Sequence, residues 1–155
     1  MVALQHHERY NGEGYPKGLG NDEIHEFARI TGLVDVYDAV TADRIYRKAH
    51  PVHEAYEMLA GSGNYLFDFN VVQAFLQNIA AYPTGTIVRL STGEIGIAVE
   101  TTKGFSLYPR VRILFSAQDE QVLEKVEIRL NEQQSVFISE VLEDLDRFTP
   151  TWQKK

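Results

Sequence analysis

The spacing of apolar residues changes once along this chain of 155 residues, near Tyr82-Pro83-Thr84-Gly85. Before this point, apolar side chains recur every three or four residues, as on one face of a helix. After it, they alternate with polar residues, as in a half-buried strand. The change predicts an α+β chain, in which a helical part precedes a small antiparallel β subdomain. We divide it into residues 1–82, 83–130, and a C-terminal helix and tail over 131–155.

The helical part should contain three helices. The spacing predicts them over residues 26–40, 52–60 and 69–81, with Asp68 as the N-cap of the third. Residues 11–20 hold four glycines and a proline, so they should form a loop with unusual backbone angles.

The β part should contain three strands and a fourth, weaker one. They are predicted over residues 86–90, 95–99, 111–115 and 124–130, with glycine-containing turns between them. Beyond these, Phe137, Val141 and Leu145 are four residues apart, which predicts a helix over 133–145.

Composition excludes several classes of protein. With 15 basic and 22 acidic residues the net charge is −7, so general binding to a DNA backbone is not expected. There is no cysteine, hence no disulfide framework and no thiolate chemistry. No apolar run approaches the roughly 20 residues of a membrane span, and the first residues lack the pattern of a signal peptide. These observations predict a cytoplasmic protein.

Two groups of residues could bind metal. His6 and His7 are adjacent, and on a helix their side chains would point about 100° apart, so two ions side by side suit them better than one. A plain surface pair, or the remnant of a tag, is the alternative. Asp35 and Asp38 lie three apart on the helix over 26–40, where one could bind metal while the other hydrogen-bonds a neighbour. Both could equally face solvent.

A basic pair follows the aspartates. Arg44 and Arg47 would lie on one side of a helical turn, an arrangement that suits bidentate binding of a phosphate. The alternative is an ordinary surface ion-pair network with Asp43.

Together, these motifs resemble the HD-GYP phosphodiesterase family. The order is His-His-Glu, a glycine-rich loop with Gly-Tyr-Pro, Asp-x-x-Asp-Ala and Arg-x-Tyr-Arg, over residues 5 to about 82. The resemblance implies the C-terminal half of an HD-type all-α domain. It also implies three metal ligands, a second aspartate supporting them, three substrate contacts and three residues that shape the loop. By this resemblance the metal ligands are His6, His7 and Asp35, and the supporting aspartate is Asp38. The substrate contacts are Tyr15, Arg44 and Arg47, and the loop-shaping residues are Gly12, Gly14 and Pro16.

The family's chemistry is the hydrolysis of cyclic di-GMP at a centre of two or three metal ions, usually iron or manganese. This chain departs from the pattern, because it contains no His-Asp dipeptide and lacks the upstream ligands. Asn11 also stands where the family usually has aspartate. We therefore expect a truncated half that is inactive alone. The rival hypotheses are a non-catalytic signalling module that docks a diguanylate cyclase domain or another partner, and a phosphohydrolase acting on other nucleotides.

An incomplete helical domain should leave apolar side chains without a partner. The helix over 26–40 should either expose Ile30, Val34 and Tyr37 or cover them with another surface. We expect a homodimer or partial disorder near residues 1–20. Residues 83–130 resemble the short β extension that follows this domain in some bacterial HD-GYP proteins. A small packing module is favoured there over nucleotide binding, since no motif in it carries chemistry.

Overall fold

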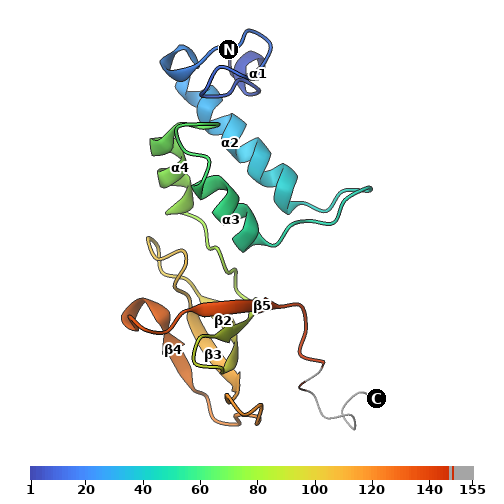
Figure 1. Cartoon of the computed structure of the whole chain (residues 1–155), viewed down its shortest axis with the longest axis vertical. Helices are drawn as coiled ribbons and strands as arrows, with labels where there is room; N and C mark the ends of the chain where they lie inside the picture. The colour runs from blue at the N-terminus through green and yellow to red at the C-terminus, as the bar shows by residue number, and fades with distance from the viewer. Residues whose placement is uncertain (147, 149–155) are drawn as a thin grey trace. The chain divides into compact units, whose positions relative to one another are not determined.

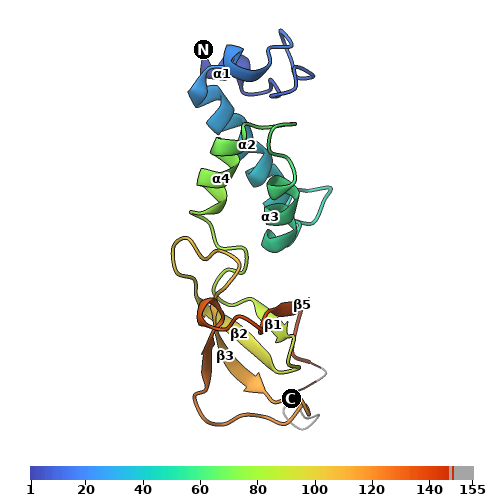
Figure 2. The ribbon, with the colours of Figure 1, turned by 60° about the vertical axis from the view of Figure 1, so that its left-hand side comes forward.

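The structure is a computed structural model that describes residues 1–146 and 148. The chain divides into two compact units, Met1–Ile79 and Ala80–Lys155. The first is helical and the second is a β-sheet, as Figures 1 and 2 show. The predicted α+β class is confirmed.

The helical unit contains α1 (Val2–Gln5), a short 3-10 helix η1 (Asn21–Glu23), α2 (Glu26–Thr41), α3 (Val52–Ala60) and α4 (Phe69–Leu76). The three predicted helices are present, although α4 ends earlier than expected. Asp68 caps α4 as predicted, because its carboxylate accepts hydrogen bonds from the backbone N–H groups of Asn70 (2.8 Å) and Val71 (3.4 Å). Within the described residues, no helix has both the length and the apolar character needed to cross a membrane.

The core of this unit forms where α2, α3 and α4 meet. The buried members are Leu33, Leu59, Phe67, Val72 and Leu76. Partly buried side chains surround them, among them Tyr37, whose ring meets Phe75 edge-on with 5.1 Å between centroids. Burial raises the pKa of the Tyr37 hydroxyl, because the phenolate would lose hydration there.

The apolar stripe predicted on α2 is divided between core and surface. Leu33 is fully buried, but the exposed fractions of Phe27, Ile30 and Val34 are 62%, 40% and 42%. Ile30 and Val34 line a groove of about 310 Å³ between α2 and α4. Exposure of these two side chains is one of the two outcomes that the sequence predicts for this helix. Tyr37 is only partly exposed, because its ring packs on Phe75 of α4.

The β unit is one antiparallel sheet of five strands. They are β1 (Ile87–Leu90), β2 (Ile95–Glu100), β3 (Arg110–Phe115), β4 (Glu127–Arg129) and β5 (Ile138–Leu142), in the order β4-β3-β2-β1-β5. Burial alternates along β1 and β3, which explains why the period of two predicts these strands. The fourth predicted strand is shorter than expected and runs into a 3-10 helix, η2 (Leu130–Glu132).

The predicted helix over residues 133–145 was wrong. Residues Ile138–Leu142 form β5, which pairs with β1 so that Ile87 faces Leu142 and Val88 faces Val141. The pairing contains a bulge next to Leu90, which disturbs the alternation and leaves apolar residues at a spacing that imitates a helix. The segment therefore belongs to the sheet and is no separate C-terminal helix.

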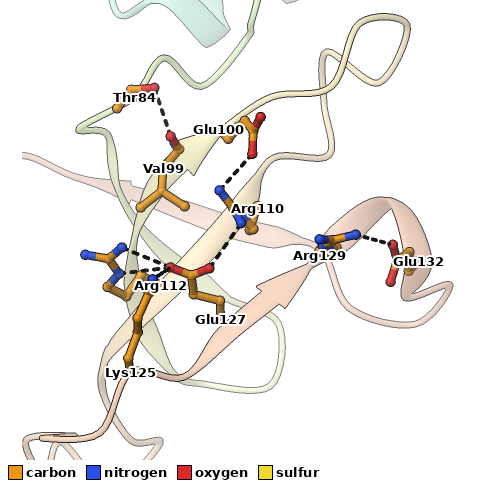
Figure 3. A network of polar contacts seen from close by, with 9 residues as sticks. All are labelled: Thr84, Val99, Glu100, Arg110, Arg112, Lys125, Glu127, Arg129 and Glu132. Atoms are coloured by element: carbon orange, nitrogen blue, oxygen red, sulfur yellow. Dashed lines mark hydrogen bonds and ion pairs between the residues drawn. The ribbon is translucent and has the colours of Figure 1, made fainter.

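A charged network covers one face of β3 and β4 (Figure 3). The Glu127 carboxylate accepts hydrogen bonds from Arg112 at 3.1 and 2.9 Å and forms an ion pair with Arg110 at 3.3 Å. Arg110 also pairs with Glu100 at 2.7 Å, and Lys125 lies 3.6 Å from Glu127. The hydrogen bond from Arg112, with the charges of its basic neighbours, lowers the pKa of Glu127. The Glu127 carboxylate thus interacts with three cationic side chains.

Candidate functional site

His6 and His7 lie directly after α1, where the chain turns. Both are half-buried, and their ring centroids are 3.9 Å apart with a tilt of 40° between the rings. Nδ1 of His6 lies 3.3 Å from the carbonyl oxygen of Val2. The rings therefore lie together rather than diverging as on a continuous helix. The reason is local, since α1 has only four residues and His6 is its C-cap.

The glycine-rich loop folds back over His7. Its ends meet where Asn11 pairs with Gly20, and Gly12 and Gly18 adopt φ of 80° and 67°, which other residues rarely take. Between them, the Tyr15 ring stacks on the His7 imidazole with 4.8 Å between centroids and an angle of 26°. The loop thus brings Tyr15 to one of the two histidines.

Gly14 shapes this approach. A Cβ atom at Gly14 would overlap the backbone of Glu8 and Arg9, so only glycine fits where the loop crosses this segment. Pro16 is exposed and follows Tyr15 in the turn. The close approach at Gly14 supports the shaping role that the resemblance implies for it, and the role of Pro16 stays a prediction.

Glu8 is a site residue whose role was not predicted from the sequence pattern. Its side chain is buried, and its two carboxylate oxygens accept hydrogen bonds from the backbone N–H groups of Lys17 (2.8 Å) and Leu19 (3.0 Å). The sequence did contain a signal for this role, because a carboxylate next to a glycine-rich loop can accept hydrogen bonds from the backbone N–H groups of that loop. Glu8 also lines a water-sized cavity with Arg29 and Asp68, which form an ion pair at 2.6 Å.

The predicted ligands do not assemble into a metal centre. Asp35 and Asp38 are exposed on α2. Helix α2 reaches the histidines at Gly32, where an added Cβ would lie 2.5 Å from the carbonyl oxygen of His6. Across residues 1–146 and 148, no group of three or more His, Cys, Asp or Glu side chains could hold an ion. His6 and His7 are brought together, whereas Asp35 belongs to no such group of three in this structure.

Arg44 and Arg47 lie in a tight turn and not on a helix, which corrects the expected helical turn. Each donates its backbone N–H to the other's carbonyl oxygen, at 2.9 and 3.0 Å. The helix ends before them because Ala42 is extended. The Arg47 guanidinium also donates to the carbonyl oxygen of Ala39. Ile45 and Tyr46, at the tip, are 93% and 97% exposed, and the segment projects from the helices in Figures 1 and 2.

Models of two known families match the chain, one in each of its two parts. Residues 1–71 match the model of the HD domain, and residues 87–147 match that of the KOW domain associated with HD domain. The first part of the chain is part of an HD domain of the HD-GYP type. The second match falls on the sheet, so the two families divide the chain much as the two compact units do.

Several curated proteins are similar to this HD-domain chain. Cyclic di-GMP phosphodiesterase PA4108 of Pseudomonas aeruginosa is 43% identical over 117 residues, which are 76% of this chain and 28% of that protein. Cyclic di-GMP phosphodiesterase response regulator RpfG of Xanthomonas campestris is 41% identical over 80 residues, 52% of this chain and 21% of that protein. 3'3'-cGAMP-specific phosphodiesterase 3 of Vibrio cholerae is 44% identical over 54 residues, 35% of this chain and 12% of that protein.

The chain therefore spans about a quarter or less of the length of these relatives. Their names describe whole proteins that hydrolyse cyclic dinucleotides. The similarity to PA4108 extends over 117 residues, more than the 79 residues of the helical unit, so it includes part of the β unit.

Proposed function

We propose that this chain is part of a metal-dependent phosphodiesterase that hydrolyses a cyclic dinucleotide. The observation that carries the proposal is the His6-His7 pair beneath the Gly-Tyr-Pro loop, in a segment 43% identical to a cyclic di-GMP phosphodiesterase. In this proposal His6 and His7 donate to metal, Asp35 is a further donor, and Asp38 supports it. Tyr15, Arg44 and Arg47 contact the substrate.

The residues present do not fit a complete metal centre. Two imidazoles are neighbours, but a third donor does not gather with them among the described residues. A centre for iron or manganese would need donors beyond this pair. We derive no catalytic step through such a centre, and we propose that the chain alone does not turn over substrate.

The direct experiment is a turnover assay of the purified chain with Mn²⁺, using cyclic di-GMP and 3'3'-cGAMP as substrates. No hydrolysis is expected of either. Hydrolysis by the chain that is lost in His7→Ala would contradict the proposed inactivity.

A longer polypeptide tests the positive half of the proposal. If the coding sequence upstream of Met1 contains a His-Asp pair, a protein extended through it should hydrolyse a cyclic dinucleotide with added Mn²⁺. His7→Ala should remove that activity, while His53→Ala, a histidine on α3, should retain it. An extended protein that contains the pair, binds Mn²⁺ and still hydrolyses neither dinucleotide would refute the proposed function.

The exposed side chains favour one alternative. Tyr15, Ile45 and Tyr46 present 61%, 93% and 97% of their surface to solvent, as residues of a docking site for a protein partner would. In that alternative the chain is a non-catalytic signalling module that binds a diguanylate cyclase domain. Metal analysis of the extended protein separates the two functions, because docking needs no iron or manganese.

A further inference from the structure

The glycine-rich loop is held by the residue that follows His7. Glu8 is 5% exposed, and each carboxylate oxygen accepts one backbone N–H, from Lys17 at 2.8 Å and from Leu19 at 3.0 Å. A buried carboxylate is tolerated only when its oxygens are hydrogen-bonded. Bonds of this charge-assisted kind are roughly twice as strong as those between neutral groups. Both carboxylate oxygens of Glu8 therefore hold the part of the loop at Lys17 and Leu19.

The near side of the loop is held by His7 itself. The N–H of Tyr15 donates to the carbonyl oxygen of His7 at 3.3 Å, and the Tyr15 ring stacks on the imidazole. The segment between these attachments contains Tyr15-Pro16. Fixing both sides holds the tyrosine ring in place, and the stacked ring limits rotation of the imidazole.

We propose that Glu8 is a positioning residue, which keeps Tyr15 stacked on His7 and so sets the orientation of the His7 imidazole. The inference rests on the proposed function, in which His7 donates to metal. Glu8 acts through the loop and contacts neither metal nor substrate in this proposal. Residues around a metal ligand commonly set its ring orientation by hydrogen bonding; here a stacked ring held by a loop does so.

The base of the loop is closed without Glu8. Asn11 pairs with Gly20, and the N–H of Asn21 donates to the carbonyl oxygen of Tyr10 at 3.0 Å. A change at Glu8 should therefore release the middle of the loop while its ends remain joined. This makes the effect on Tyr15 separable from unfolding.

The experiment compares Glu8→Gln with Glu13→Gln in the full chain. Glutamine keeps the size of glutamate but has only one acceptor oxygen, so one of the two backbone hydrogen bonds is lost. Glu13 is an exposed residue of the same loop, and it bonds Asn11 Nδ2 at 2.7 Å. Amide hydrogen exchange and the NMR shifts of the His7 ring protons are measured for each protein.

Glu8→Gln should accelerate exchange at Lys17 or Leu19 about tenfold or more, as loss of a hydrogen bond to a charged group predicts. It should also move the His7 ring-proton shifts toward those of an unstacked imidazole. Glu13→Gln should change neither measurement. Unchanged ring shifts in folded Glu8→Gln would overturn the proposal.

If Glu8→Gln does not fold, Glu8→Asp replaces it. Aspartate keeps both oxygens and the charge but is shorter, so it should hold the loop in part and give intermediate His7 shifts; wild-type shifts with fast exchange at both amides would overturn the proposal. These measurements need neither metal nor substrate. Absence of turnover in the extended protein would therefore refute the proposed function without altering the answer on Glu8.

Discussion

The two units of this chain differ in the lining of the grooves that they leave open. The groove of the β unit, about 440 Å³, is lined by the amides Asn131, Gln133 and Gln134 as well as by apolar and aromatic side chains. In the β unit, the inward residues of β1, β2 and β3 are covered, and outward arginines of β3 are paired with Glu100 and Glu127. In the helical unit, Ile30 and Val34 remain exposed along a groove of about 310 Å³. All residues proposed to carry chemistry lie in the helical unit. The proposed chemistry thus lies in the unit whose open groove runs along α2 and α4.

The largest difference should appear when the units are produced separately. Residues 80–155 should unfold cooperatively on heating, because their sheet encloses its own core. Residues 1–79 should lack a sharp transition and bind a hydrophobic dye, because an apolar groove stays open. Circular dichroism and dye fluorescence measure both. A cooperative transition of residues 1–79 without dye binding would remove the distinction.

Self-association is the next expected effect. If two copies cover their grooves with each other, light scattering should give a mass above that of the monomer at micromolar concentration. Ile30→Gln with Val34→Gln should weaken the dimer at least tenfold, since about 1.4 kcal/mol of lost apolar burial suffices for that factor. Met58→Gln is the control, because Met58 is 46% exposed on α3 outside the groove. A monomeric wild-type chain would contradict the predicted homodimer.

The smallest effect concerns Glu127 in the β unit. Its folded-state pKa is lowered, so its contribution to stability is present above the ordinary carboxyl pKa and is lost as pH falls through the folded value. The melting temperature of the wild-type chain should fall between about pH 5 and pH 3. Glu127→Gln should flatten this dependence.

Glu132→Gln is the matched control for that measurement. Glu132 pairs with Arg129 at 3.2 Å, and both side chains are more than half exposed, so the pair should contribute little. Equal pH profiles for the two variants would show that the network around Glu127 has no special role in acid stability.

Local patterns predicted most elements because their causes are local. The helix α4 could be read from Asp68 and the spacing of Val72 and Leu76, and the strands β1 and β3 from alternation. The strand β5 could not, because its hydrogen bonds go to β1, about 50 residues earlier, and the bulge beside Leu90 is visible only in the pairing. The side of α2 that is exposed depends on which elements pack against the helix, and the spacing of apolar residues does not indicate this.

The candidate site was predicted as a set of residue types rather than as a geometry. Motif order identified His6, His7 and Tyr15, and the structure places these three together. The order of the motifs could not indicate that Asp35 fails to join these residues in a cluster, because this depends on distances across the fold. The role of Glu8 was missed because its partners are backbone N–H groups, and the amino-acid sequence does not show which of these groups will bind a side chain.

Gly32 gives the helical unit a dependence that involves no side chain. Its Cα faces the carbonyl oxygen of His6, and a methyl group there would lie only 2.5 Å from that oxygen. The close approach of α2 to the histidine segment is therefore possible only because Gly32 carries a hydrogen atom in place of a side chain. One added methyl group at Gly32, a residue with no side chain of its own, would therefore force α2 and the His6-His7 segment apart.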